Sequence, residues 1–196
     1  MEKINFIKTF IPQGDFREKY EHGGMMVRHL AAVLDEKMGA YECYECTVPI
    51  GEYDEGEIQK AFIEFTAKMD ALKLKQAKVE KIAEITAYDT SDKVNGFVLN
   101  GLLVWLDKAT RVGLMNSTTI AKAAGQQTTT LWLGDVKLEV DCDKAIQLLS
   151  ALEMYALECF NVTAAQKAAV TDLKTIKEVE AFDVTADYPK QLEMKL

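Results

Sequence analysis

The clearest hydrophobic pattern along the chain lies between residues 57 and 88, where apolar side chains recur at alternating spacings of four and three residues. This spacing keeps one face of a helix apolar and is typical of helices that pack against other helices. The first positions of the series are Ile58, Phe62, Phe65, Met69 and Leu72. The same register continues through Gln76, Val79, Ala83 and Thr86. We therefore predict a long helix that carries a packing seam.

Two uses of this seam remain open. In the first, the seam docks on the chain's own C-terminal helix. In the second, it joins copies of the chain in a dimer or trimer, with Gln76 as the polar residue that fixes the register. The second use makes the chain one of its own partners.

A β-hairpin followed by a helix is predicted in the middle of the chain. Asn100-Gly101 lies between two apolar runs, and both residues can adopt the positive φ that a type I′ turn requires. Asp107 follows the hairpin and is suited to cap a helix that ends near Gly125.

The same arrangement recurs further along the chain. Residues 128–133 and 136–140 flank the turn residues Gly134-Asp135, and the alternation of the second run predicts a hairpin with one apolar face. Asp141 and Asp143 are candidate caps for a final long helix that reaches about Leu173.

The N-terminal part is predicted to form a small β-α-β module. Residues 4–11 alternate weakly and end at the turn signal of residues 12–15. A helix is predicted over residues 25–38 because Met26, Leu30, Val33 and Leu34 share one helical face. Gly39 is the expected C-cap of this helix, and residues 41–48 are typical of a strand.

These elements together predict an α+β fold in which two β-hairpins, each followed by a capped helix, pack with long helices. The expected division is an N-terminal module over residues 1–56, a connecting helix over residues 57–92 and a C-terminal α+β domain over residues 93–196.

Composition narrows the possible partners. The chain of 196 residues has a formal net charge of −8 and 48% hydrophobic residues, and no cluster of Lys and Arg suggests binding to nucleic acid. No apolar run approaches the length of a membrane span, and the first residues do not resemble a secretory signal. We expect a soluble protein that stays in the cytoplasm or becomes part of a particle, with its four cysteines reduced.

The sequence offers no recognisable catalytic, cofactor or metal site. Cys43 and Cys46 have the C-x-x-C spacing, but positions i and i+3 of a strand face opposite sides, and a zinc site normally requires a second close pair. His22 and His29 are about two helical turns apart, which is too far for a shared ion. We therefore expect a protein without enzymatic activity.

Trp105 and Trp132 lie on what we take to be corresponding strands of the two hairpins. The simpler interpretation is that they pack the helices onto the sheets. The alternative is that they line a binding surface for a small molecule or a carbohydrate.

Several motifs resemble an uncharacterised family of phage and prophage proteins that are found near tail-fibre genes, in a form similar to those of Bacteroides-type gut bacteria. The motifs are Asn95-Gly96-Phe97, Asn100-Gly101, the run from Trp105 to Arg111, Thr130-Leu131-Trp132 and the run from Leu152 to Ala156. The resemblance covers about residues 72–196. It implies a structural or assembly role in a phage tail, with tail components as protein partners, and it implies no activity.

Overall fold

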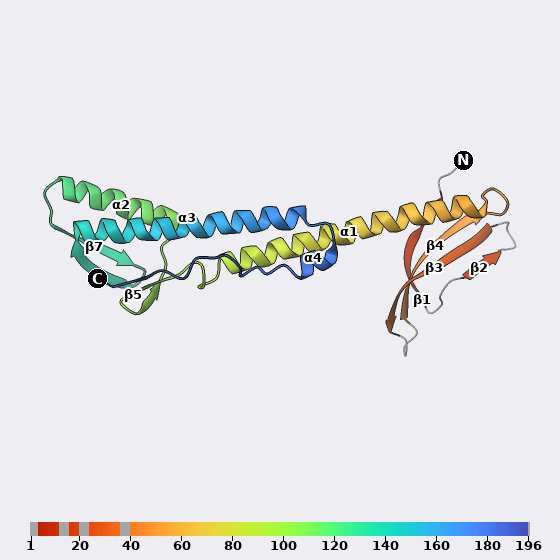
Figure 1. Cartoon of the computed structure of the whole chain (residues 1–196), viewed down its shortest axis with the longest axis horizontal. Coiled ribbons are helices and arrows are strands. Elements are labelled where there is room, and N and C mark those ends of the chain that lie inside the picture. Colours follow the sequence, from red (N-terminus) through yellow and green to blue (C-terminus); the bar gives the residue numbers. More distant parts are fainter. Residues whose placement is uncertain (1–3, 12–15, 20–23, 36–39, 196) are drawn as a thin grey trace. The chain divides into compact units, whose positions relative to one another are not determined.

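The computed structural model describes residues 4–11, 16–19, 24–35 and 40–195 (Figure 1). The fold is α+β, as predicted. The chain forms two compact units, residues 1–73 and 74–196, and the long helix α1 (Glu55–Asp89) contributes to both. We describe each unit by itself.

The first unit contains a four-stranded antiparallel sheet with the strand order β1-β4-β3-β2. Its strands are β1 (Ile7–Ile11), β2 (Phe16–Lys19), β3 (Gly24–Asp35) and β4 (Ala40–Pro49). The strands predicted over residues 4–11 and 41–48 are confirmed as β1 and β4. The turn predicted at residues 12–15 and the cap at Gly39 lie outside the described residues.

The predicted helix over residues 25–38 is wrong, and with it the β-α-β module, because residues 25–35 belong to the strand β3. Residues 36–38 lie outside the described residues. The ladder between β3 and β4 contains two irregularities, between Leu30 and Ala32 and between Val33 and Asp35. Such bulges interrupt the two-residue alternation of a strand, and the apolar positions then acquire a spacing close to that of a helix. The strand β3 is paired with β2 on one side and with β4 on the other, and this pairing stabilises the strand over a helix.

The first half of α1 covers one face of this sheet. Asp54 and Glu57 cap the helix reciprocally, since each carboxylate accepts a hydrogen bond from the other residue's backbone N–H, at 2.8 and 2.9 Å. The core beneath the helix contains a cluster of rings in which the centroid of Phe65 lies 5.0 Å from that of Tyr44 and 5.9 Å from that of Phe6. Ile58 is fully buried in the same core.

A buried carboxylate adds a charged cluster to this unit. Glu42 is only 7% exposed, and its side chain lies 2.8 Å from the Lys8 ammonium and 3.7 Å from that of Lys73. The Tyr44 hydroxyl donates a further hydrogen bond to Glu42 at 3.3 Å. The hydrogen bond from Lys8 is the main reason why the pKa of Glu42 lies below its usual value.

The second unit contains both predicted hairpins and both capped helices. Its elements after α1 are β5 (Phe97–Leu99), β6 (Leu102–Val104), α2 (Lys108–Ala123), β7 (Thr128–Leu133), β8 (Val136–Asp141) and α3 (Cys142–Asp172). Asn100 and Gly101 have φ values of 51° and 84°, as expected for the predicted turn. Asp107 and Asp141 cap α2 and α3 through bonds to backbone N–H groups.

The end of the chain returns to the first hairpin. A short helix, α4 (Ile176–Glu180), is followed by the strand β9 (Glu193–Met194), which pairs in parallel with β5. Gln166 donates a hydrogen bond to the backbone oxygen of Ala186 at 2.7 Å and holds the returning segment on α3. The sequence did not indicate this strand.

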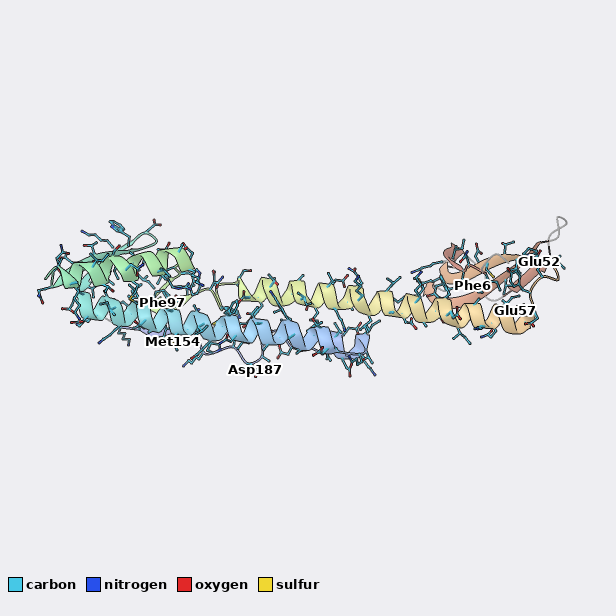
Figure 2. The ribbon with its side chains drawn as sticks, turned by 90° about the horizontal axis from the view of Figure 1, so that it is seen from above. Phe6, Glu52, Glu57, Phe97, Met154 and Asp187 are labelled. Atoms are coloured by element: carbon cyan, nitrogen blue, oxygen red, sulfur yellow. The ribbon has the colours of Figure 1, made fainter. Side chains whose placement is uncertain are left out.

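The helix α3 is the centre of the second unit. Its buried side chains, with those of β5, β7 and β8, form one apolar cluster that includes Phe97, Leu131, Leu148 and Leu152. The later half of α3 lies beside the second half of α1 (Figures 1 and 2). There, Lys78 donates a hydrogen bond to the backbone oxygen of Thr171 at 2.6 Å, and Ile85 is fully buried.

Candidate functional site

A pocket of about 450 Å³ lies in the second unit between the start of α2 and the middle of α3. We call it the Trp105 pocket. Its walls combine the Trp105 ring with Leu157 and Phe160 of α3, and its charged groups include Lys108 and Arg111 of α2. A volume of this order is typical of a site for a small molecule or for one large side chain.

Arg111 is the best-fixed charged group at this pocket. Its side chain is only 7% exposed. Nε donates a hydrogen bond to Glu153 at 2.7 Å, and Nη1 donates to the backbone oxygen of Leu106 at 2.7 Å. The guanidinium carbon lies 5.3 Å from the centre of the Trp105 ring, within the range of a cation–π contact. The guanidinium therefore ties α2, α3 and the end of the first hairpin together.

The carboxylates at the pocket have structural partners. Asp107 accepts hydrogen bonds from the backbone and the hydroxyl of Thr110, at 2.9 and 2.6 Å, and the hydroxyl bond is the main cause that lowers the pKa of Asp107. Asp89 accepts a hydrogen bond from Thr163 at 2.7 Å. Glu153 in turn bonds to Arg111. The acidic groups of the pocket therefore form hydrogen bonds that stabilise the fold.

Cys159, which also lines the pocket, is poorly suited to nucleophilic chemistry. Burial raises the pKa of its thiol, and the thiolate is the reactive form of cysteine. Burial likewise raises the pKa of the neighbouring Tyr155, whose hydroxyl donates a hydrogen bond to the backbone oxygen of Val94 at 3.2 Å. Both groups remain neutral at physiological pH.

An exposed apolar surface of the second unit lies on α3 next to this pocket. Met154, Leu157 and Phe160 are 58%, 49% and 67% exposed. Figure 2 shows Met154 on the side of α3 that faces away from α2. Exposed apolar groups that gather at one place often mark an interaction site.

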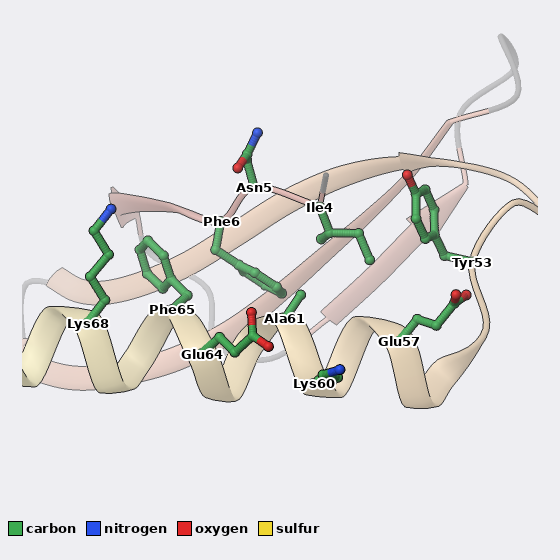
Figure 3. Close-up of a pocket in the computed structure, with 10 residues that line it drawn as sticks. All are labelled: Ile4, Asn5, Phe6, Tyr53, Glu57, Lys60, Ala61, Glu64, Phe65 and Lys68. Atoms are coloured by element: carbon green, nitrogen blue, oxygen red, sulfur yellow. The ribbon is translucent and has the colours of Figure 1, made fainter. Parts of the chain in front are cut away.

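A second pocket, of about 620 Å³, belongs to the first unit (Figure 3). It lies between residues 4–6 and α1, where Phe6 and Phe65 form an apolar wall. The rim carries charges of both signs, from Glu57, Lys60, Glu64 and Lys68 of α1. Because Glu57 already caps the helix, and because positive and negative side chains alternate along the rim, the charges favour no particular ligand.

The structure divides the predicted seam residues between buried and exposed positions. Ile58, Phe62, Phe65 and Met69 pack within the core of the first unit. Leu72 and Val79 are exposed. In the second unit the buried or half-buried positions of α1 follow a different register, namely residues 74, 77, 78, 81, 82, 85, 88 and 89.

The two tryptophans do not occupy equivalent positions, which corrects the expectation from the hairpin pattern. Trp105 follows β6, the second strand of its hairpin, whereas Trp132 lies in β7, the first strand of the other. Trp105 is half-buried and lines the pocket. Trp132 is 57% exposed and is not among the residues that line the Trp105 pocket.

The other candidate residues occupy separate places. Cys43 and Cys46 are both buried on β4. His29 lies on β3, and His22 lies outside the described residues. Within the described part of the chain, no three His, Cys, Asp or Glu side chains gather as a metal site would require. No helix in that part is long and apolar enough to cross a membrane.

Sequence reasoning missed the pairing of Arg111 with Glu153. The two residues are 42 positions apart, and nothing in their local sequences links them. The sequence gives only an indirect indication of this pair. Helical periodicity can place an Arg one turn into a capped helix, and a Glu on an otherwise apolar helix, on the sides of their helices that pack against another element.

Comparison with known proteins gives one match. Residues 76–186 match the family model described as a domain of unknown function, DUF4376. No curated protein and no solved structure matches the chain. The matched residues include the whole of the Trp105 pocket and all of α2 and α3.

Proposed function

This chain belongs to the DUF4376 family, whose function is unknown, and we propose that it is a non-enzymatic protein that docks to other proteins as a structural or assembly component of a phage or prophage tail. Its place of action is the cytoplasm of the host cell or the particle itself. Its partners are other proteins, namely tail components and further copies of the chain, and not nucleic acid or membranes.

The observation that carries the docking role is the exposed apolar surface on α3. Met154, Leu157 and Phe160 present large side chains to solvent. Burying such side chains in an interface is favourable, by roughly 25 cal/mol for each Å² of apolar surface removed from water. The fixed charges of the Trp105 pocket, which serve the fold, support a docking role over a catalytic one.

The tail context rests on the resemblance of the quoted motifs to phage and prophage proteins. The net charge of −8 supports protein partners over nucleic acid, because phosphate binding relies on clustered positive charge.

A deletion experiment tests the proposed role. In a phage or inducible prophage that carries this gene, we expect its deletion to reduce the number of tailed particles counted by electron microscopy, and the intact gene supplied in trans to restore them. A gene with both Leu157→Glu and Phe160→Glu should fail to restore them, whereas one with the exposed-surface control Leu102→Glu should succeed. Normal numbers of infectious tailed particles from the deletion would refute the tail role.

The Trp105 pocket favours a second candidate function, the binding of a small molecule or carbohydrate. An indole ring beside a buried guanidinium offers both a stacking surface and hydrogen-bond donors. In a Trp132→Phe variant, Trp105 is the one remaining tryptophan, so its fluorescence reports on this pocket. Saturable quenching by N-acetylglucosamine or its short oligomers would support this function, and an unchanged spectrum with all of them would count against it.

A further inference from the structure

The exposed side of α3 carries a regular stripe that the core of the second unit does not use. Its residues recur at alternating spacings of four and three, the spacing of a helix–helix seam. They are Ser150, Met154, Leu157, Asn161, Ala164 and Ala168, and all six are exposed. The buried residues of α3, such as Leu152, Cys159 and Val170, lie on the opposite side of the helix.

This side of the helix carries very little charge. The structure describes all of α3, and between residues 150 and 169 Glu158 is the one charged residue among those that are exposed. In the whole chain 28% of the residues are charged, and the solvent-facing side of a helix usually holds most of them. A face with this composition is typical of a surface that another helix covers.

The stripe is also self-complementary in size. Its first half presents the large side chains Met154 and Leu157, its second half presents Ala164 and Ala168, and Asn161 lies between the halves. If a second copy of α3 lies antiparallel on the first, the large side chains of each copy meet the alanines of the other. Alternation of large and small residues across a helix pair lets the two layers interdigitate.

From this pattern we propose that the α3 stripe binds the same stripe of a second copy of the chain, antiparallel and about a two-fold axis beside Asn161. A two-fold axis places the same patch on both copies, as such interfaces require. The inference rests on the proposed function, because it names the first partner of the α3 surface.

Charges beside the stripe favour the antiparallel direction. Glu153 lies near its beginning and Lys167 near its end, and both are half-buried. Antiparallel pairing brings the Glu153 carboxylate of one copy, one oxygen of which bonds to Arg111, towards the ammonium of the other, whereas parallel pairing brings like charges together. The asparagines near the axis can bond to each other and fix the register.

The dimer is expected to depend on concentration. From Ser150 to Ala168 the stripe is about 27 Å long at the usual helical rise. One helix pair of this length buries less surface than a large permanent interface, so monomer and dimer should both be present in dilute solution.

Light scattering coupled to size-exclusion chromatography tests this dimer. The monomer mass is 21.9 kDa, and we expect the wild-type mass to rise towards twice this value as the concentration increases. Leu157→Glu should raise the dissociation constant at least about tenfold, the effect of roughly 1.4 kcal/mol, because it places two charges in the interface. Leu102→Glu, on the exposed face of β6, should leave the constant unchanged, and circular dichroism should show that both variants are folded.

Three results would overturn the proposal. The first is a wild-type protein that stays monomeric up to ~0.5 mM, a concentration at which contacts weaker than about 4.5 kcal/mol escape detection. The second is a dimer that Leu157→Glu leaves intact, and the third is an oligomer larger than a dimer. The deletion experiment tests the tail role separately from the dimer. If the protein is monomeric but its gene is needed for tails, the proposed dimer is refuted and the tail role is not. If the protein is a dimer but its gene is dispensable for tails, the tail role is refuted and the dimer is not.

Discussion

Replacing Arg111 by alanine should destabilise the second unit more than any other single change at the Trp105 pocket. The guanidinium is almost fully buried, and it bridges the Leu106 backbone oxygen and the Glu153 carboxylate, at 2.7 Å each. Truncation leaves the buried carbonyl without its donor, because the methyl group of alanine cannot replace a hydrogen bond.

The size of this effect follows from the three contacts that are lost. A hydrogen bond from a charged donor to a buried oxygen contributes about 1.5–3 kcal/mol. The pairing with Glu153, whose carboxylate reaches solvent, adds roughly 0.2–1 kcal/mol after screening. The contact with Trp105 adds about 0.5–1 kcal/mol. Since neighbouring contacts are not additive, we expect a loss of about 2–4 kcal/mol in the free energy of unfolding.

Urea unfolding followed by tryptophan fluorescence is the suitable assay. Trp105 and Trp132 are the two tryptophans of the chain, and both lie in the second unit, so the signal reports on that unit even if the two units unfold separately. Lys108→Ala, at the exposed rim of the same pocket, should change the free energy by less than about 0.5 kcal/mol. Glu153→Gln keeps the size of the side chain and removes only the charge, so it should cost under about 1 kcal/mol.

The comparison between these variants can refute the reasoning. If Arg111→Ala costs no more than Glu153→Gln, the buried bond to Leu106 contributes nothing, and the guanidinium is held by the surface pair alone. In that case Arg111 would not be the group that joins the first hairpin to α2 and α3.

Three further predictions follow from particular residues. Gly101→Ala should destabilise the second unit by about 1–2 kcal/mol, because the φ of 84° at this position is unfavourable for a residue with a Cβ. Gly113→Ala lies inside α2 with open space around it, so it should stabilise the unit by about 0.5–1 kcal/mol. The same urea unfolding assay measures both changes. The pKa of Glu42 is lowered, mainly by its bond to Lys8, so its contribution to stability is present above the ordinary carboxyl pKa and is lost as the pH falls through the lowered value. In thermal unfolding followed by circular dichroism, the melting temperature of Glu42→Gln should therefore fall less steeply towards acidic pH than that of the wild type. An identical fall in both proteins would contradict this. Acrylamide should quench Trp132 strongly, since it is 57% exposed, and Trp132→Phe should remove most of the quenchable signal.

The parts of the fold that were predictable from sequence are those that local signals determine. Asn100-Gly101 fixes its hairpin through backbone angles that few residue pairs adopt. Asp107 and Asp141 begin their helices by bonding to the first free backbone N–H groups. These preferences act over four residues or fewer, so a single sequence contains all the information they require.

The missed elements depend on contacts between distant residues. The strand β3 was taken for a helix because its bulges disturb the alternation, and only its pairing with β2 and β4 selects the strand. The strand β9 has two residues and pairs with β5 about 95 positions earlier. In α1 one helical register was extended too far, because the first half faces a sheet and the second half packs among the elements of the other unit, so Leu72 and Val79 are exposed while Ile85 is buried.

The candidate site was predictable only in part. The sequence indicates Trp105 as an aromatic residue on a hairpin strand, but its contact with Arg111, and the bond from Arg111 to Glu153, join elements that the sequence does not connect. The segment that forms α3 is rich in apolar residues, and the sequence does not say which side of such a helix faces the core. Only the packing assigned Leu152 to the core and Leu157 to the surface.

Cross-linking at engineered cysteines tests most directly whether two copies pair through α3. Asn161→Cys places a thiol beside the proposed two-fold axis, while Ser150→Cys places it about 16 Å further along each helix, so that the two copies of that thiol are about 33 Å apart. With a short bismaleimide, and with the wild-type chain and its buried cysteines as background, we expect a covalent dimer from Asn161→Cys and none from Ser150→Cys. Equal yields from both variants would contradict the antiparallel arrangement, and no covalent dimer from either would contradict pairing through α3 altogether.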